Sequence, residues 1–180
     1  MMKNIGVRYG LLGGVAVVFY FALLYFSRKE LFLHPGLQWA SLLIYLLCMY
    51  RAARKDVALH SSQRDFRTVI RTPFIVFLLI NIAYWLFYYA LHLADPALLQ
   101  METALDLAFK KQQLTAGLGD PQQANQLREQ IMALEREASQ PQIQPVGPIV
   151  FRLAIGSIGG FLLAAGVVAL VRSGGKESVT

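Results

Sequence analysis

The sequence predicts an all-α, polytopic membrane protein with four transmembrane helices and an extramembrane helical hairpin between the third and the fourth. Three observations support this class. Of the 180 residues, 56% are hydrophobic and only 16% are charged, which is too apolar for a soluble domain of this length. Four long apolar stretches recur along the chain. The polar segment before the last stretch has the periodicity of two amphipathic helices.

The first two predicted spans cover residues 6–26 and 31–50. A bilayer core about 30 Å thick requires about 20 mostly apolar residues in a helix, and both stretches approach that length. Arg8 stands near the start of the first span, where its long side chain reaches the headgroups. The second span starts irregularly, because "HPG" at 34–36 precedes its apolar part, "LQWASLLIYLLCMY". The first lacks a cleavage site for a signal peptide, so we expect it to remain in the protein.

The third and fourth predicted spans cover residues 73–93 and 148–171. The third, "PFIVFLLINIAYWLFYYALHL", contains no charge, and Pro73 suits the first turn of a helix, where a missing N–H costs little. The fourth carries Arg152 one turn from its start, able to reach outward to the headgroups. The residues that follow it, up to Thr180, are expected to form a cytoplasmic tail.

The distribution of basic residues predicts the orientation. Cytoplasmic segments of membrane proteins are enriched in Lys and Arg. With four spans, the connecting segment 51–72 lies on the same side as both termini, and that side carries ten of the seventeen basic residues. We therefore expect a protein of the bacterial cytoplasmic (inner) membrane, with both termini cytoplasmic and residues 94–147 periplasmic.

The basic segment 51–72 suggests either nucleic acid or anionic lipid as a partner. It contains no nucleic-acid-binding motif, whereas attraction to anionic headgroups explains a basic segment between apolar spans. Phe66, Val69 and Ile70 lie among the arginines and suggest a short helix on the membrane surface. The expected contacts are with lipid headgroups, and not with nucleic acid, at Arg51, Arg54, Lys55, Arg64, Arg67 and Arg71.

Residues 94–147 are expected to form a helical hairpin followed by a proline-rich linker, "SQPQIQPVGP". In "DPALLQMETALDLAFKKQQL", Asp95 suits the N-cap and Pro96 the first helical position. Asp120 and Pro121 begin a second helix of the capping-box type. Each helix has one apolar seam, so an antiparallel pair buries the seams against each other. The predicted seam consists of Leu98, Met101, Leu105, Leu127, Ile131 and Leu134.

The same segment is acidic, with seven carboxylates against four basic residues. Glu102 and Asp106 stand four residues apart on one predicted helix, but such pairs are common on exposed helices, and the segment contains no histidine. We interpret the carboxylates as a solvated face. The segment is instead expected to bind an envelope protein partner.

Small residues recur at every fourth position in the first and fourth spans. Such rows let helix backbones approach closely, which favours packing in lipid, where apolar burial alone supplies no driving force. The rows are able to join the two spans within one chain, which we favour, or to join two chains in a homo-oligomer. Their members are Gly6, Gly10, Gly14, Gly156, Gly160 and Ala164.

Other functions have weaker support. A small oligomeric transporter or channel is the alternative, but the span interiors offer only Asn81 and scattered hydroxyls, and Asn81 suits an interhelical hydrogen bond. A membrane enzyme ranks third, using His34, His92 and Asp95 near the outer boundary. No nucleotide, zinc-protease or nucleophile motif occurs, and one cysteine, Cys48, excludes an intrachain disulfide. We expect no catalytic, cofactor-binding or metal-binding residues and no cofactor.

The order of these elements resembles a known family. Three spans, "DPALLQMETALDLAFKKQQL", a glutamine- and glutamate-rich helical segment and a glycine-rich last span are similar to uncharacterised four-span bacterial membrane proteins, common in Bacteroidota, that form a domain-of-unknown-function family. The resemblance runs from "KNIGVRYGLLGG" to "GFLLAAGVVALVRSGGK". It implies an inner-membrane protein with a helical insertion before the last span, and it assigns no activity. The leading expectation is thus a non-enzymatic interaction or accessory protein.

Overall fold

The computed structural model of the chain describes residues 4–60, 65–116, 121–138 and 146–174. Every regular element in these ranges is an α-helix, so the all-α class predicted from the sequence is confirmed for the described part of the chain. The helices belong to two compact units, of which the first is Met1–Phe87 with Val146–Thr180 and the second is Tyr88–Pro145.

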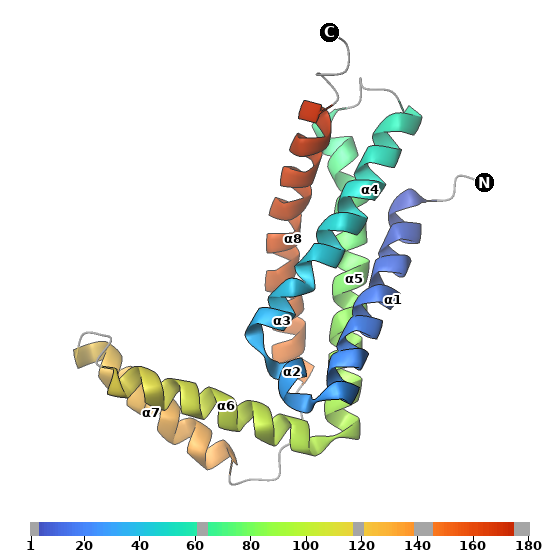
Figure 1. The fold of residues 1–180 in the computed structure, drawn as a ribbon. Helices are drawn as coiled ribbons and strands as arrows, with labels where there is room; N and C mark the ends of the chain where they lie inside the picture. The colour runs from blue at the N-terminus through green and yellow to red at the C-terminus, as the bar shows by residue number, and fades with distance from the viewer. Residues whose placement is uncertain (1–3, 61–64, 117–120, 139–145, 175–180) are drawn as a thin grey trace. The chain divides into compact units, whose positions relative to one another are not determined.

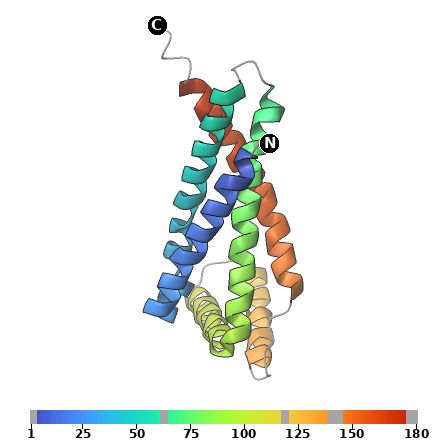
Figure 2. The same ribbon diagram turned by 90° about the vertical axis from the view of Figure 1, so that its right-hand side faces the viewer.

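The first unit is a bundle of four long helices, α1 (Ile5–Ser27), α4 (Leu42–His60), most of α5 (Phe66–Ala94) and α8 (Val146–Gly174). Figures 1 and 2 show these helices side by side, with α1 and α5 beginning at the end of the bundle where α4 and α8 finish. Side-chain contacts agree with these directions. The Arg152 guanidinium of α8 lies 5.9 Å from the Trp85 ring centroid, and the Phe161 ring lies 5.7 Å from that of Phe74, as in an antiparallel pair.

Three helical stretches in the described residues are long and apolar enough to cross a membrane, namely Ile5–Ser27, Phe66–Ala94 and Gly147–Ser173. They contain the predicted first, third and fourth spans. The 29 residues of α5 extend about 43 Å at 1.5 Å per residue, which exceeds a hydrocarbon core of roughly 30 Å. Pro73, expected in a first turn, therefore lies inside α5, and Val69 and Ile70 are buried there rather than on the membrane surface.

The prediction of four spans is wrong, because residues 31–50 do not form one helix. The segment is divided among α2 (Lys29–Leu33), α3 (Pro35–Ala40) and the beginning of α4. Pro35 lacks an N–H and disfavours the α conformation of the preceding residue. His34 is accordingly extended, with φ −71° and ψ 120°.

A second interruption and the charges of α4 also prevent residues 31–50 from forming one continuous span. The Ser41 hydroxyl donates to the Gln38 carbonyl at 2.7 Å, a local bond that competes with a regular helix. The helix α4 then runs from Leu42 into the basic segment, so its apolar part, 42–50, is only about 14 Å long. The predicted loop 51–72 is thus largely helical, since α4 contains Arg51, Arg54 and Lys55 while α5 contains Arg67 and Arg71.

Both rows of small residues lie against α5. In α1, a Cβ on Gly10 would lie 2.7 Å from Leu79, so a side chain there would require a shift of its neighbours. A Cβ on Gly14 would lie 3.0 Å from Ala83, a tight contact. Gly6 likewise faces Ile75. In α8, Gly156 faces Asn81, Gly160 faces Phe77, and Ala164 is fully buried. The sequence favours contact of the first and fourth spans with each other, whereas in the structure each row packs on α5.

The second unit contains the end of α5, then α6 (Pro96–Thr115) and α7 (Pro121–Ala138). The helices α6 and α7 are in contact, and Lys111 pairs with Glu135 at 2.7 Å. Asp95 occupies the N-cap position of α6, but its side chain makes no capping hydrogen bond. The predicted capping box at Asp120 and the linker residues 139–145 lie outside the described residues.

The tight contact at Gly160 predicts a large effect of one methyl group. We expect Gly160→Ala to destabilise the protein by about 1–3 kcal/mol, because its Cβ would overlap the Phe77 ring. Gly159→Ala is the matched control, since nothing lies within 4 Å of its Cβ and alanine is the better helix former. Unfolding by sodium dodecyl sulfate in mixed micelles measures both. Equal stability of the two variants would contradict the close approach of α8 to α5.

Candidate functional site

Three polar side chains meet where α5 joins α6. The Glu102 carboxylate accepts a hydrogen bond from the Tyr88 hydroxyl, and the same oxygen lies 3.1 Å from His92 Nε2. His92 Nδ1 lies 2.9 Å from the Tyr88 carbonyl oxygen, and the two rings are tilted by 35° with centroids 4.0 Å apart. Tyr88 and His92 are buried, while a third of the Glu102 side chain is exposed. All three residues belong to the second unit.

The Glu102 carboxylate contacts two residues of α5, because one of its oxygens accepts a hydrogen bond from the Tyr88 hydroxyl and also contacts His92 Nε2. The other ring nitrogen of His92 contacts the Tyr88 carbonyl oxygen. Since the His92 side chain is fully buried, the cluster fastens α6 to α5 rather than exposing a reactive group.

The cluster differs from what the sequence suggested. Glu102 was interpreted as part of a solvated face, yet it is the partner of His92, ten residues earlier. His34 is exposed and lies between α2 and α3. Within the described ranges, no group of three or more His, Cys, Asp or Glu side chains is arranged to hold a metal ion. The only sequence signal for the Glu102–His92 contact is the helix break at Asp95 that separates them.

Asn81 lies in the middle of α5 and is 7% exposed. Its Nδ2 is buried without a hydrogen-bond partner among the described residues, and it would lie 3.1 Å from a Cβ on Gly156. The amide therefore packs against the glycine row of α8. The interhelical hydrogen bond expected from the sequence is absent at Nδ2 within that part of the chain.

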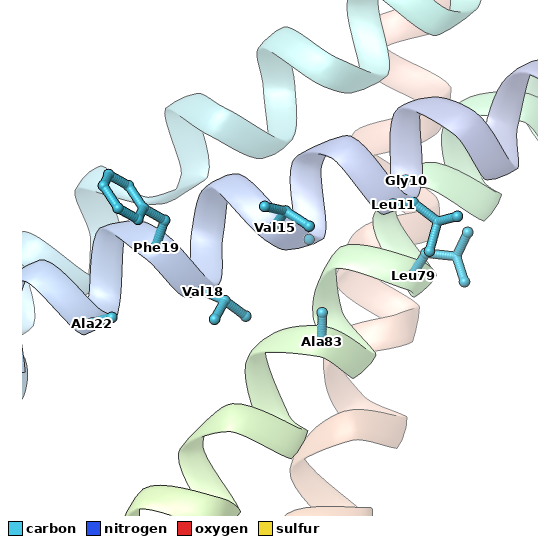
Figure 3. A pocket seen from close by; sticks show the side chains of 9 residues that line it. Gly10, Leu11, Val15, Val18, Phe19, Ala22, Leu79 and Ala83 are labelled. Carbon is cyan, nitrogen blue, oxygen red and sulfur yellow. The ribbon is translucent and has the colours of Figure 1, made fainter.

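An apolar groove of about 410 Å³ runs along the surface between α1 and α5. Figure 3 shows Val15, Val18 and Ala22 of α1 on one side and Leu79 and Ala83 of α5 on the other. Gly10 and Gly14 line the groove where α1 lies against Leu79 and Ala83 of α5. Its lining contains only hydrocarbon side chains and glycine, so it offers no chemistry of its own.

Basic residues gather at the end of the bundle where α1 and α5 begin. Arg8, Arg67 and Arg71 are exposed there at the starts of these helices. The end of α4 adds Arg51, Arg54 and Lys55, also exposed, while Arg64 lies outside the described residues. Within the basic segment, Asp56 is buried and accepts a hydrogen bond from the Thr72 hydroxyl at 2.9 Å, a contact not anticipated from the sequence.

The helix α6 turns a different face toward α7 than predicted. Its half-buried positions recur at Thr103, Leu107, Lys110 and Leu114, and Lys110 donates to Gln130 of α7 at 3.0 Å. Leu105, a predicted seam residue, is 52% exposed. At about 100° per residue, the face through Leu98 and Leu105 lies roughly half a turn from the face that meets α7.

The remaining predicted seam residues divide between two environments. Leu98 is fully buried and Met101 is half-buried, both beside Glu102 near the start of α6. In α7, Ile131 is buried, while Leu127 and Leu134 are half-buried at the same helical spacing. The α7 side of the pair therefore follows the expected periodicity, and the α6 side does not.

Three long apolar helices, packed through glycine, indicate a multi-pass membrane protein of the helical class. More specifically, the chain belongs to the family described as protein of unknown function (DUF4199), whose model matches residues 8–173. No curated protein and no solved structure matches the chain significantly. The family match covers all three apolar helices and the α6–α7 pair.

Removal of the Glu102 carboxylate tests the cluster. We expect Glu102→Leu to lower the free energy of opening at the α5–α6 junction by about 1–3 kcal/mol, because it removes the carboxylate that accepts from the buried Tyr88 hydroxyl and contacts buried His92. Glu135→Leu is the control, because its ion pair with Lys111 is exposed and such pairs contribute about 0–1 kcal/mol. Amide hydrogen exchange of residues 88–105 measures the effect. Unchanged exchange in Glu102→Leu would refute the fastening role.

Proposed function

We propose that the protein is a non-enzymatic accessory protein of the bacterial cytoplasmic (inner) membrane, and that its α6–α7 pair binds a protein partner outside the membrane. The observation that carries this proposal is the outward face of α7. Met132 is 51% exposed there, although it is a large apolar residue on a helix outside the three membrane-crossing candidates.

The surroundings of Met132 have the composition of a docking surface. Asn125, Glu129 and Arg136 are exposed and lie on the same helical stripe, at spacings of three and four residues. An apolar centre with a polar and charged rim is the usual anatomy of a protein interface. Methionine is also flexible enough to adapt to a partner's surface. The helix α7 is held beneath this stripe by its contact with α6, where Ile131 is buried.

The orientation is supported by the charge of the bundle ends. The exposed basic residues Arg8, Arg51, Arg54, Arg67 and Arg71 lie at the end where α1 and α5 begin. Basic residues accumulate on the cytoplasmic side and interact with anionic headgroups there. Since α5 leads away from this end, its last residue and the following α6 lie on the extracytoplasmic side in this proposal.

An oligomeric transporter or channel is the second candidate. It is supported by the unpartnered Nδ2 of Asn81 inside a membrane-crossing helix, because buried polar groups in spans often serve ion or solute pathways. It requires a defined oligomer. Native mass spectrometry in lipid nanodiscs that shows only monomers would remove this candidate.

Cysteine labelling tests the orientation. In a Cys48→Ser background, we expect a membrane-impermeant maleimide to label Gln123→Cys in intact cells, because α7 lies outside the membrane. Leu59→Cys, at the exposed basic end of α4, should be labelled only after permeabilisation. The opposite pattern would invert the proposed topology.

Crosslinking in the native membrane tests partner binding. We expect defined crosslinked partners to disappear when residues 96–138 are replaced by a flexible linker, and to be reduced at least about tenfold by Met132→Asp, because a buried unpaired charge costs more than 1.4 kcal/mol at an interface. Ala104→Asp is the matched control, since Ala104 is exposed on α6 and away from this stripe. Partners that persist without residues 96–138 would reject the proposal.

A further inference from the structure

We propose that the exposed face of α6 formed by Leu105 and Phe109 lies in the interfacial layer of the bilayer, so that α6 is a membrane-surface helix. We call these two residues the α6 apolar face. They are 52% and 59% exposed, and no described contact covers them. This surface is distinct from the α7 stripe around Met132, and the inference does not rest on the proposed partner.

The α6 apolar face continues an interface that already exists in the second unit. Leu98, Glu102, Leu105 and Phe109 follow one another at spacings of four, three and four residues, which places them on one stripe of the helix. The first half of this stripe is covered, since Leu98 is fully buried and Glu102 bonds to Tyr88 and His92 of α5. The second half, Leu105 and Phe109, is exposed.

The Glu102 contact gives the direction in which the stripe points. Tyr88 lies six residues before Ala94, the last residue of α5, which corresponds to about 9 Å along the helix. The stripe is therefore turned toward the part of α5 that precedes its end. Because α5 is a membrane-crossing candidate, this is the part that leads into the bilayer. Residues farther along the same stripe consequently face the bilayer surface beside α5.

The connection to α5 sets the depth of the helix. Only Asp95 separates the end of α5 from Pro96, the first residue of α6, so α6 starts at the level where α5 leaves the bilayer. The opposite side of α6, through Leu107 and Lys110, meets α7 and leaves the apolar face free of that helix. Phenylalanine and leucine on one face of an amphipathic helix are the usual residues that enter the headgroup and acyl boundary.

Spin labelling of the full chain in phosphatidylcholine and phosphatidylglycerol vesicles tests the inference. Single cysteines replace Leu105, Phe109, Ala104 and Met132 in a Cys48→Ser background, and each carries a nitroxide. All four positions are exposed, so a label does not require repacking. Collision with oxygen reports lipid, and collision with a water-soluble nickel chelate reports water. We expect the oxygen-to-nickel ratio at 105 and 109 to exceed the ratios at 104 and 132 several-fold.

Two other results would overturn the inference. Nickel accessibility at 105 and 109 equal to that at 104 would place the α6 apolar face in water. Low collision rates with both reagents would show that protein covers the face, either another part of this chain or a second copy. Neither result would affect the crosslinking outcome at Met132, so the failure of this inference and the failure of the proposed function remain distinguishable.

Discussion

The close approach of α1 and α8 to α5 is the contact on which the rest of the first unit depends. Lipid chains are as apolar as leucine, so helices in a bilayer associate through dispersion contacts and not through removal of apolar surface from water. Glycine permits these contacts, because its missing Cβ lets a Leu79 or Phe77 side chain rest on the neighbouring backbone. Gly13 makes the same kind of close contact with two helices, since Ile80 of α5 and the Cys48 sulfur of α4 both border it. The helices α1 and α8 thus contact α5 through glycine and also contact α4.

The segment before α5, which comprises α2, α3 and α4, has to cross the bundle without a continuous apolar helix. It must return the chain along the bundle, yet only 42–50 of α4 is strongly apolar, and the rest is interrupted or charged. Aromatic and polar contacts hold the interrupted part in place. The Phe32 ring of α2 lies 5.7 Å from Phe21 of α1, and the Tyr20 hydroxyl donates to the Leu37 carbonyl at 3.0 Å. These side-chain contacts stabilise a segment that lacks the continuous helical hydrogen bonds of an uninterrupted span.

The second unit contains a buried polar cluster at the start of α6 and two different exposed surfaces, one on α6 and one on α7. The cluster of Tyr88, His92 and Glu102 fastens the start of α6 to the last turns of α5, and its burial makes it a structural joint. Beyond the joint, α6 has an apolar side and a side that meets α7, while α7 presents Met132 on a polar background. In our proposals, lipid occupies the first surface and a protein partner the last.

The sequence by itself determined the all-α class, the three helices long and apolar enough to cross a membrane in the described residues, and the starts of α6 and α7 near Pro96 and Pro121, because hydropathy and proline act locally. Tertiary structure decided which neighbour each face meets. The glycine rows indicate that another helix lies close, but they do not indicate that this helix is α5. The helix α6 has apolar residues on two faces, so its periodicity did not show that Leu107, and not Leu105, lies toward α7. Glu102 resembles any solvated carboxylate until the turn at Asp95 brings it to His92.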